Sequence, residues 1–231
     1  MEPIVNIALP ELMKIQVQTL YTMNMQQRLT GINEPEGGQA PALFIGMTSA
    51  GLLSYYHEHL PPDLMDQLAT EAKLPLDIPK LLGKIEAFKP VKNLWMGPAF
   101  VFQEKWNEWH SCVQLIDHHN MFLLAEHFPD LIGRLHAKAP VVAYVIENSA
   151  VAVCCSARIS VLGAEASLYT MPAYRGYGYG VETVKCWQYH VQESGRIPLY
   201  STSWDNLSSQ QVARKLGLFQ YGMDFSVTTS S

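Results

Sequence analysis

The sequence predicts an α+β protein in which a helix-covered sheet follows a mainly helical N-terminal region. Two runs rich in β-branched residues, 141–146 and 150–159, are joined by a short polar turn and are apolar on both faces. Such runs are typical of strands inside a covered sheet. The strand patterns that follow alternate with helical patterns, which indicates a layer of strands flanked by helices. Those strands are expected at 165–171, 197–203 and 219–227, and the helices at 181–193 and 206–217.

The N-terminal region has weaker secondary-structure patterns, broken by several proline and glycine residues. Apolar residues recur at helical spacing from Pro10 to Leu29, and a turn-rich break follows at 31–41. A short strand is expected at 42–47. Pro61-Pro62 opens a helix that should run to about residue 72. Further along, helical spacing from His119 to Leu135 predicts a helix that Pro129 must kink or divide.

Composition excludes several classes of protein. Of the 231 residues, 48% are apolar and 16% are charged, which is incompatible with an intrinsically disordered chain. The net charge of −5 provides no overall field for holding DNA or anionic lipid, so neither nucleic acid nor membrane is an expected partner. No stretch approaches the roughly 20 apolar residues that cross a bilayer, and the N-terminus lacks the basic segment of a signal peptide.

Cysteines and histidines point to a cytoplasmic protein without a metal. The four cysteines form no C-x-x-C pair, so reduced and mostly buried thiols are expected. The histidines clustered in the middle of the chain lack the i, i+3 or i+4 spacing of helical metal ligands, and no metal site is predicted. They are His110, His118, His119 and His127.

A glycine-rich segment, 175–180, separates a predicted strand from a predicted helix and reads Arg-Gly-Tyr-Gly-Tyr-Gly. Glycines let the backbone approach a ligand closely, and the unpaired N–H groups at a helix start favour an anion. The segment therefore indicates a phosphate-bearing ligand; the alternative is a purely structural turn. A Rossmann fingerprint is excluded because position 181 is Val181, and a P-loop because no Gly-Lys-Ser/Thr follows.

The residues of this loop resemble the acetyl-CoA signature R/Q-x-x-G-x-G/A of the GNAT superfamily of N-acetyltransferases. Arg175, Gly178 and Gly180 occupy its fixed positions. A second family motif, an Asn that begins a short helix ending in K-x-G-F, is similar to the segment from Asn206 to Leu218. Because the two motifs occur in the family's order, the region from roughly residue 95 to the end is identified as a member of this superfamily.

The resemblance implies a mixed, mostly antiparallel sheet that splays open between the strand ending at Met171 and the strand beginning at Ile197. Acetyl-CoA, the expected cosubstrate, would enter this gap, with its pyrophosphate on the loop amides. Its pantetheine arm would lie between the first strand and the start of the second motif. The cofactor-binding residues so implied are Leu168, Tyr169, Thr170, Arg175, Gly176, Tyr177, Gly178, Tyr179, Gly180, Asn206 and Ser209.

Glu165 is expected to be the catalytic base. An alkylammonium acceptor with a pKa of about 10 must lose a proton before it can attack a thioester. Glu165 is the only acid between Asn148 and Gly180, and it begins the strand that leads into the loop. Many members of the superfamily carry a glutamate on the corresponding strand. The alternative interpretation is a solvated charge at a strand end.

The general acid is not identified by the sequence. Members of the superfamily often carry a Tyr two residues before the Lys of the second motif, where this chain has Ala213. A thiol with a pKa near 8.5 leaves tolerably as the anion, so no acid is strictly required. Tyr200 and Tyr221 are the alternative donors.

The function implied is transfer of an acetyl group from acetyl-CoA to a primary amine, by direct attack within a ternary complex. The alternatives are a non-catalytic acyl-CoA-binding protein and a transferase of a longer acyl group. We expect residues 93–231 to form the GNAT-like catalytic domain. Residues 1–92 would form a module for the acceptor or for a partner. The acceptor and the oligomeric state are not indicated by the sequence.

Overall fold

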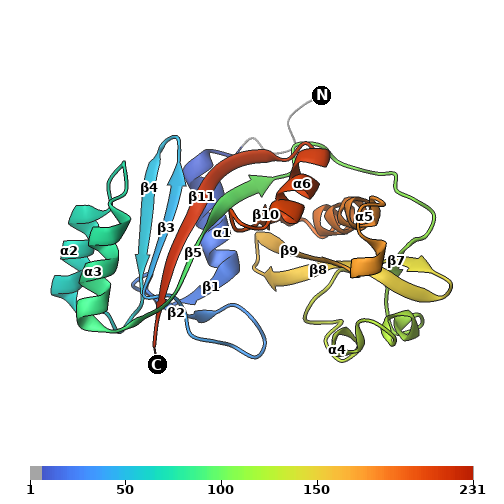
Figure 1. The fold of residues 1–231 in the computed structure, drawn as a ribbon, viewed down its shortest axis with the longest axis horizontal. Coiled ribbons are helices and arrows are strands. Elements are labelled where there is room, and N and C mark those ends of the chain that lie inside the picture. The colour runs from blue at the N-terminus through green and yellow to red at the C-terminus, as the bar shows by residue number, and fades with distance from the viewer. Residues whose placement is uncertain (1–6, 231) are drawn as a thin grey trace. The chain divides into compact units, whose positions relative to one another are not determined.

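The computed structural model describes residues 7–230 and divides into two compact units (Figure 1). The first, here called the terminal unit, comprises residues 7–99, 202–205 and 220–230. The second, here called the loop-bearing unit, comprises residues 100–201 and 206–219. The expected domain boundary between residues 92 and 93 stays a prediction. Residues 1–6 and 231, which the two expected domains include, lie outside the described residues.

The terminal unit contains a sheet with the strand order β4-β3-β11-β5 and a separate β1–β2 pair. The β3–β4 and β3–β11 pairs are antiparallel. Its elements are α1 (Leu9–Leu20), β1 (Tyr21–Met23), β2 (Leu29–Ile32), β3 (Leu43–Thr48), β4 (Gly51–Tyr56), α2 (Pro62–Glu71), α3 (Ile78–Phe88) and most of β5 (Val91–Val101) and of β11 (Phe219–Thr229).

Strand β3 is buried along its whole length because both of its faces are covered. Leu43 and Ile45 share a core cluster with Leu68 of α2 and Leu81 of α3. On the other face, Gly46 leaves room for the Met13 side chain of α1, with which a Cβ at position 46 would clash. The close approach of α1 to the sheet therefore requires a glycine at this position.

The loop-bearing unit contains a sheet with the strand order β6-β7-β8-β9-β10. Every neighbouring pair is antiparallel except β9–β10, which is parallel. This confirms the expected mixed, mostly antiparallel sheet. The elements are β6 (Val113–Ile116), η1 (Met121–Leu124), α4 (Pro129–Ile132), β7 (Val141–Ile146), β8 (Ser149–Ile159), β9 (Gly163–Thr170), η2 (Pro172–Tyr174), α5 (Tyr179–Glu193), β10 (Ile197–Ser201) and α6 (Leu207–Lys215).

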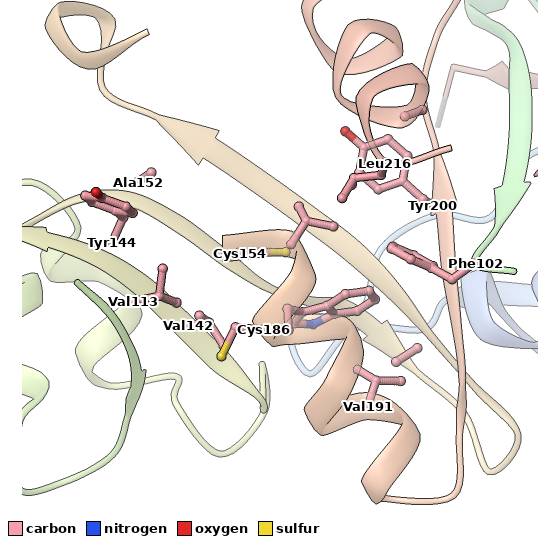
Figure 2. Packing of buried hydrophobic residues seen from close by; sticks show 14 of the residues in the cluster. Phe102, Val113, Val142, Tyr144, Ala152, Cys154, Cys186, Val191, Tyr200 and Leu216 are labelled. Carbon is pink, nitrogen blue, oxygen red and sulfur yellow. The ribbon is translucent and has the colours of Figure 1, made fainter. Parts of the chain in front are cut away.

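Helix α5 covers one face of this sheet, and η1 and α4 cover the other (Figure 1). Trp187 of α5 is fully buried, and its indole N–H donates to the hydroxyl of Ser156 on β8 at 3.2 Å. Figure 2 shows the core beneath α5, where Cys154 of β8 and Cys186 of α5 lie among aliphatic and aromatic side chains. This core fixes the position of α5, and with it the position of the glycine loop that leads into the first turn of α5.

Three sequence-based expectations are corrected by the structure. The helix expected over 10–29 ends at Leu20, because the chain turns there into the β1–β2 pair. The helix expected over 119–135 is reduced to η1 and the four-residue α4, and α4 begins at the breaking residue Pro129. The N-terminal region is not mainly helical: β3 and β4 pair with each other, and β3 with β11, so the region is mixed α and β.

Within residues 7–230, none of the helices combines the length and the apolar character that crossing a membrane requires.

Candidate functional site

The glycine loop, residues 175–180, connects η2 to α5 through two left-handed backbone positions. Gly176 has a φ of 89° and Gly178 a φ of 87°, values that side-chain-bearing residues adopt only with strain. Gly178 is the N-cap of α5, and no side chain caps the helix there. A Cβ placed on either glycine would meet no atom within 4 Å. The loop therefore presents bare backbone, at the positive end of the helix dipole, to open space, which fits an approaching phosphate group.

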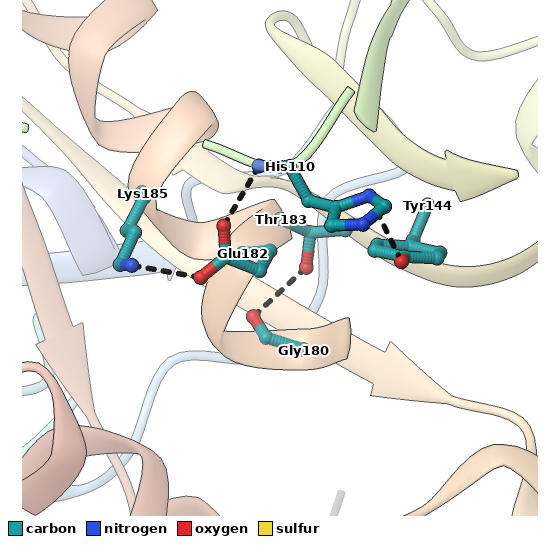
Figure 3. Close-up of polar contacts among 6 residues, drawn as sticks. All are labelled: His110, Tyr144, Gly180, Glu182, Thr183 and Lys185. Atoms are coloured by element: carbon teal, nitrogen blue, oxygen red, sulfur yellow. Dashed lines mark hydrogen bonds and ion pairs between the residues drawn. The ribbon is translucent and has the colours of Figure 1, made fainter. Parts of the chain in front are cut away.

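Gly180 has a different role from the two glycines before it. A Cβ at this position would lie 3.1 Å from Oγ1 of Thr170 and 3.3 Å from Cδ2 of Leu168. The first turn of α5 thus packs directly against the end of β9. The hydroxyl of Thr183 donates to the carbonyl of Gly180 at 2.9 Å and stabilises this turn (Figure 3). The loop is held at a defined distance from the strand proposed to bind the pantetheine arm.

Arg175 folds back onto the end of β9. Its Nε donates to the carbonyl of Thr170 at 3.1 Å, and its guanidinium carbon lies 5.7 Å from the centre of the Tyr169 ring. Tyr169 is half exposed, and its ring makes a T-shaped contact with the ring of Phe128 on the η1 and α4 face of the sheet. These contacts fix the turn from β9 into the glycine loop.

Strands β9 and β10 pair only over a short stretch and then part. Their parallel register matches Gly163 with Ile197 and ends where Glu165 lies opposite Leu199. Past this point β9 continues to Thr170 and pairs only with β8 on its other side. Leu168, Tyr169 and Thr170 therefore lie on the part of β9 that is no longer paired with β10. The parting of the two strands, expected from the resemblance, is present in the structure.

Glu165 lies at the point where β9 and β10 part. Its Oε1 accepts hydrogen bonds from the main-chain N–H of Ser201 at 2.6 Å and from the Ser201 hydroxyl at 2.7 Å. The carboxylate thus binds a main-chain N–H of β10 beyond the last pair between the two strands. Its second oxygen, Oε2, is buried and has no hydrogen-bond partner among the described residues. Oε1 therefore holds the contact with β10, while Oε2 can accept a proton.

The environment of Glu165 raises the pKa of its carboxyl group to about 7. Burial is the largest cause, since only 4% of the residue is exposed. The two hydrogen bonds from Ser201 and the charge of Arg158 act in the opposite direction and lower the pKa. The alternative interpretation of Glu165 as a solvated charge is wrong. A carboxyl group with a pKa near 7 has the value that suits a general base at neutral pH.

The raised pKa makes the stability of the protein depend on pH. The folded state holds the proton of Glu165 up to about pH 7, whereas an unfolded glutamate releases it near 4.5. The contribution of Glu165 to the free energy of unfolding is fully present below its pKa in the unfolded chain, and it is lost as the pH rises through its pKa in the folded protein. We expect the free energy of unfolding of Glu165→Gln, relative to that of the wild type, to rise by about 2 kcal/mol as the pH increases from 5.5 to 8.5. Urea unfolding of both proteins at the two pH values measures this difference.

Glu193→Gln is the matched control, because Glu193 is an exposed partner of Lys105. Its stability difference from the wild type should stay flat over the same interval. A flat difference for Glu165→Gln as well would contradict the raised pKa of Glu165.

The second motif forms the start of α6. Asn206 is the N-cap of this helix, and its Oδ1 accepts hydrogen bonds from the main-chain N–H of Ser209 at 3.1 Å and from the Ser208 hydroxyl at 2.9 Å. The hydroxyl of Tyr200, on β10, lies 2.7 Å from Oγ of Ser209. The structure thus brings Asn206 and Ser209 together in the first turn of α6 and links that turn to β10.

The two tyrosines considered as proton donors have different surroundings. Burial raises the pKa of Tyr200 well above its ordinary value, so its phenol stays neutral and can donate a hydrogen bond. The hydroxyl of Tyr221 donates to Oε1 of Gln16 in the core of the terminal unit. Ala213 is buried in the core beneath α6.

A pocket of about 430 Å³ opens beside the glycine loop. It is lined by His110, Tyr144, Tyr177, Gly178, Tyr179, Val181, Glu182 and Lys215. The main-chain N–H of His110 donates to Oε2 of Glu182 at 2.8 Å, while Nζ of Lys185 lies 2.7 Å from Oε1 of the same carboxylate (Figure 3). His110, Tyr144 and Glu182 were not predicted from the sequence as site residues. Only the i, i+3 spacing of Glu182 and Lys185 was visible in the sequence.

The cysteines are free and three of the four are buried. Burial raises the pKa of Cys155 to about 11 and that of Cys186 to about 12, and it raises the pKa of Cys154 as well. These three thiols stay protonated at neutral pH and are poor nucleophiles. Within residues 7–230, no three His, Cys, Asp or Glu side chains come close enough together to hold a metal ion.

Comparison by sequence finds no relative: no family model matches the chain, and no curated protein does. Comparison by structure does. A GCN5-related N-acetyltransferase from Kribbella flavida is 13% identical, with a TM-score of 0.51 over 98% of this chain and 97% of that chain. A GCN5-related N-acetyltransferase-like protein from Streptococcus suis is 16% identical, with a TM-score of 0.49 over 95% and 100%.

A third structure, a protein from Salmonella typhimurium solved with its cofactor acetyl-CoA, is 12% identical. It has a TM-score of 0.40 over 51% of this chain and 92% of that chain. The match with the Kribbella flavida protein extends over almost the whole of both chains. At this low identity the likeness concerns the fold, and the fold class expected from the sequence is confirmed.

Proposed function

We propose, from the premise that this chain has the fold of the GNAT acetyltransferases, that it transfers an acetyl group from acetyl-CoA to a primary amine. One observation carries the proposal: a buried glutamate with a pKa near 7 lies where β9 and β10 part, on the strand that leads into the glycine loop. Transfer to an amine acceptor requires a base of this kind to take the acceptor's proton.

In the proposed complex, the backbone of the glycine loop binds the pyrophosphate of acetyl-CoA. The pantetheine arm lies along the edge of β9 from Leu168 to Thr170, which is no longer paired with β10. Asn206 and Ser209 contact the arm from the start of α6. This arrangement would bring the thioester toward the point where the strands part and Glu165 is buried.

The reaction follows as a direct transfer. The amine nitrogen attacks the thioester carbonyl carbon, a C–N bond forms, and the carbonyl oxygen becomes an oxyanion. Collapse of this intermediate breaks the C–S bond and releases the CoA thiolate. Before the attack, the alkylammonium acceptor gives one proton to Oε2 of Glu165, directly or through water, while Oε1 remains bound to Ser201. The second proton leaves the nitrogen to water as the amide forms. The thiolate, with a thiol pKa of about 8.5, departs as the anion or with a hydrogen bond from the Tyr200–Ser209 pair.

A route through an acyl-enzyme is disfavoured. It would need an activated thiol, and Cys154, Cys155 and Cys186 are buried with pKa values raised by that burial. Direct attack within a ternary complex needs none of them.

The test is release of free CoA from acetyl-CoA in the presence of a panel of primary amines, with the tertiary amine triethylamine as the unreactive control. We expect release with at least one primary amine and none with triethylamine, because only a nitrogen that bears a proton gives a stable amide. Binding of acetyl-CoA by calorimetry, without release with any amine, would favour the non-catalytic alternative. Propionyl-CoA and butyryl-CoA in the same assay separate acetyl transfer from transfer of a longer group.

A further inference from the structure

Four aromatic rings form a continuous stack beside the glycine loop. The centres of the Tyr177 and Tyr179 rings are 5.6 Å apart, with 18° between their planes. The Tyr179 and Tyr144 rings follow at 4.1 Å and 21°, and the Tyr144 and His110 rings at 5.2 Å and 30°. These residues come from the loop, from α5, from β7 and from the segment before β6. Four separate segments of the chain thus contribute one ring each to the stack.

The inner end of the stack is anchored and the outer end is open. Tyr144 is buried, and its hydroxyl lies 3.0 Å from Nδ1 of His110 (Figure 3). Tyr177, at the other end, is 70% exposed. A large aromatic side chain left this exposed between two left-handed glycines has one face packed on Tyr179 and little covering the rest. An exposed aromatic face supported by a rigid stack is a platform for a planar ligand.

The rings form a wall of the 430 Å³ pocket, a volume within the range of small-molecule sites. The charge of Glu182 in this wall is compensated by Lys185 at 2.7 Å and by the main-chain N–H of His110. Lys215, at the end of α6, adds a positive charge to the lining. The pocket therefore combines an aromatic surface with a cation, which suits a purine nucleotide better than an aliphatic or a cationic ligand.

We propose that the exposed face of Tyr177 binds the purine ring of the CoA nucleotide and that Tyr179 and Tyr144 support it from behind. This inference rests on the proposed function, because it takes the loop around Tyr177 as the pyrophosphate site. Tyr177 lies within that loop, so a base joined to the pyrophosphate through one ribose reaches it. Tyr177 is then a specificity-determining residue for the nucleotide half of acetyl-CoA and has no role in the transfer chemistry.

The experiment compares two probes by calorimetry: CoA, and 4′-phosphopantetheine, which lacks the nucleotide. Tyr177→Leu should weaken CoA binding about 10-fold, the order expected for one base stacked on an aromatic ring. It should leave 4′-phosphopantetheine binding unchanged. Tyr177→Phe, which keeps the ring, should bind both probes as the wild type does. Phe122→Leu, which removes an exposed ring from η1 on the opposite face of the sheet, controls for loss of surface aromatic area.

The outcomes separate the two proposals. Equal weakening of both probes by Tyr177→Leu, or wild-type binding of both, overturns the stacking proposal and leaves the proposed function standing. Failure of the wild type to bind CoA at all overturns the proposed function and, with it, this inference.

Discussion

Glu165→Gln is expected to slow acetyl transfer at pH 7 by about 10²- to 10⁴-fold, the usual contribution of a general base. The substitution keeps the volume of the side chain and an oxygen that can accept from Ser201, so the hydrogen bonds where β9 and β10 part are retained. It removes the oxygen that can hold the acceptor's proton. The affinity for CoA, measured by calorimetry, should be unchanged.

The pH profile distinguishes loss of the base from a structural defect. With a pKa of about 7, Glu165 is protonated and inactive as a base at lower pH, so the wild-type kcat should fall as pH drops below 7. The Gln variant should lack this inflection. The rate loss of the Gln variant relative to the wild type should shrink at high pH, because a larger fraction of an amine with a pKa of about 10 is then unprotonated.

The control for charge removal is again Glu193→Gln, which we expect to keep the wild-type rate and profile. A Glu165→Gln enzyme within a few-fold of the wild type at neutral pH would remove Glu165 from the mechanism. A uniform loss at every pH would assign it a positioning role instead.

Gly178→Val is expected to lower CoA affinity by at least about 100-fold while the protein still folds. The residue caps α5 with a φ of 87°, and its backbone faces open space where the pyrophosphate is proposed to bind. A branched side chain there fills the space that the phosphates need. It also strains a left-handed backbone position by about 1–2 kcal/mol.

Gly195→Val separates the two effects. Gly195 follows α5 with a φ of 78°, and a Cβ there likewise meets nothing within 4 Å. The two variants should lose similar stability in urea unfolding, but only Gly178→Val should lose CoA in calorimetry. If the folded Gly178→Val protein binds CoA as the wild type does, the pyrophosphate is bound elsewhere.

Features that depend on neighbours in the chain were determined by the sequence itself. The β-branched runs predicted β7 and β8, whose turn places Glu147 and Asn148 at positive φ. The glycine loop and the Asn206 cap were visible because a left-handed turn and a helix start each need particular residue types at particular positions. Such requirements act over a few residues, so a local pattern contains all the information they need.

Features that depend on which surfaces meet were decided only by the tertiary structure. The pairing of β11 with β3 joins segments about 180 residues apart, and no local period indicates it. Glu165 lies on the same face of β9 as Ser167 and Tyr169, which are exposed, so alternation along the strand does not predict its burial. That burial results from the position of Glu165 where β9 and β10 part and from its contact with Ser201. The pKa of Glu165 is raised because β9 and β10 enclose its carboxyl group. The stack from His110 to Tyr177 likewise forms because separate elements converge beside the glycine loop. Desolvation and ring stacking are properties of that convergence, and the order of residues along the chain does not specify it.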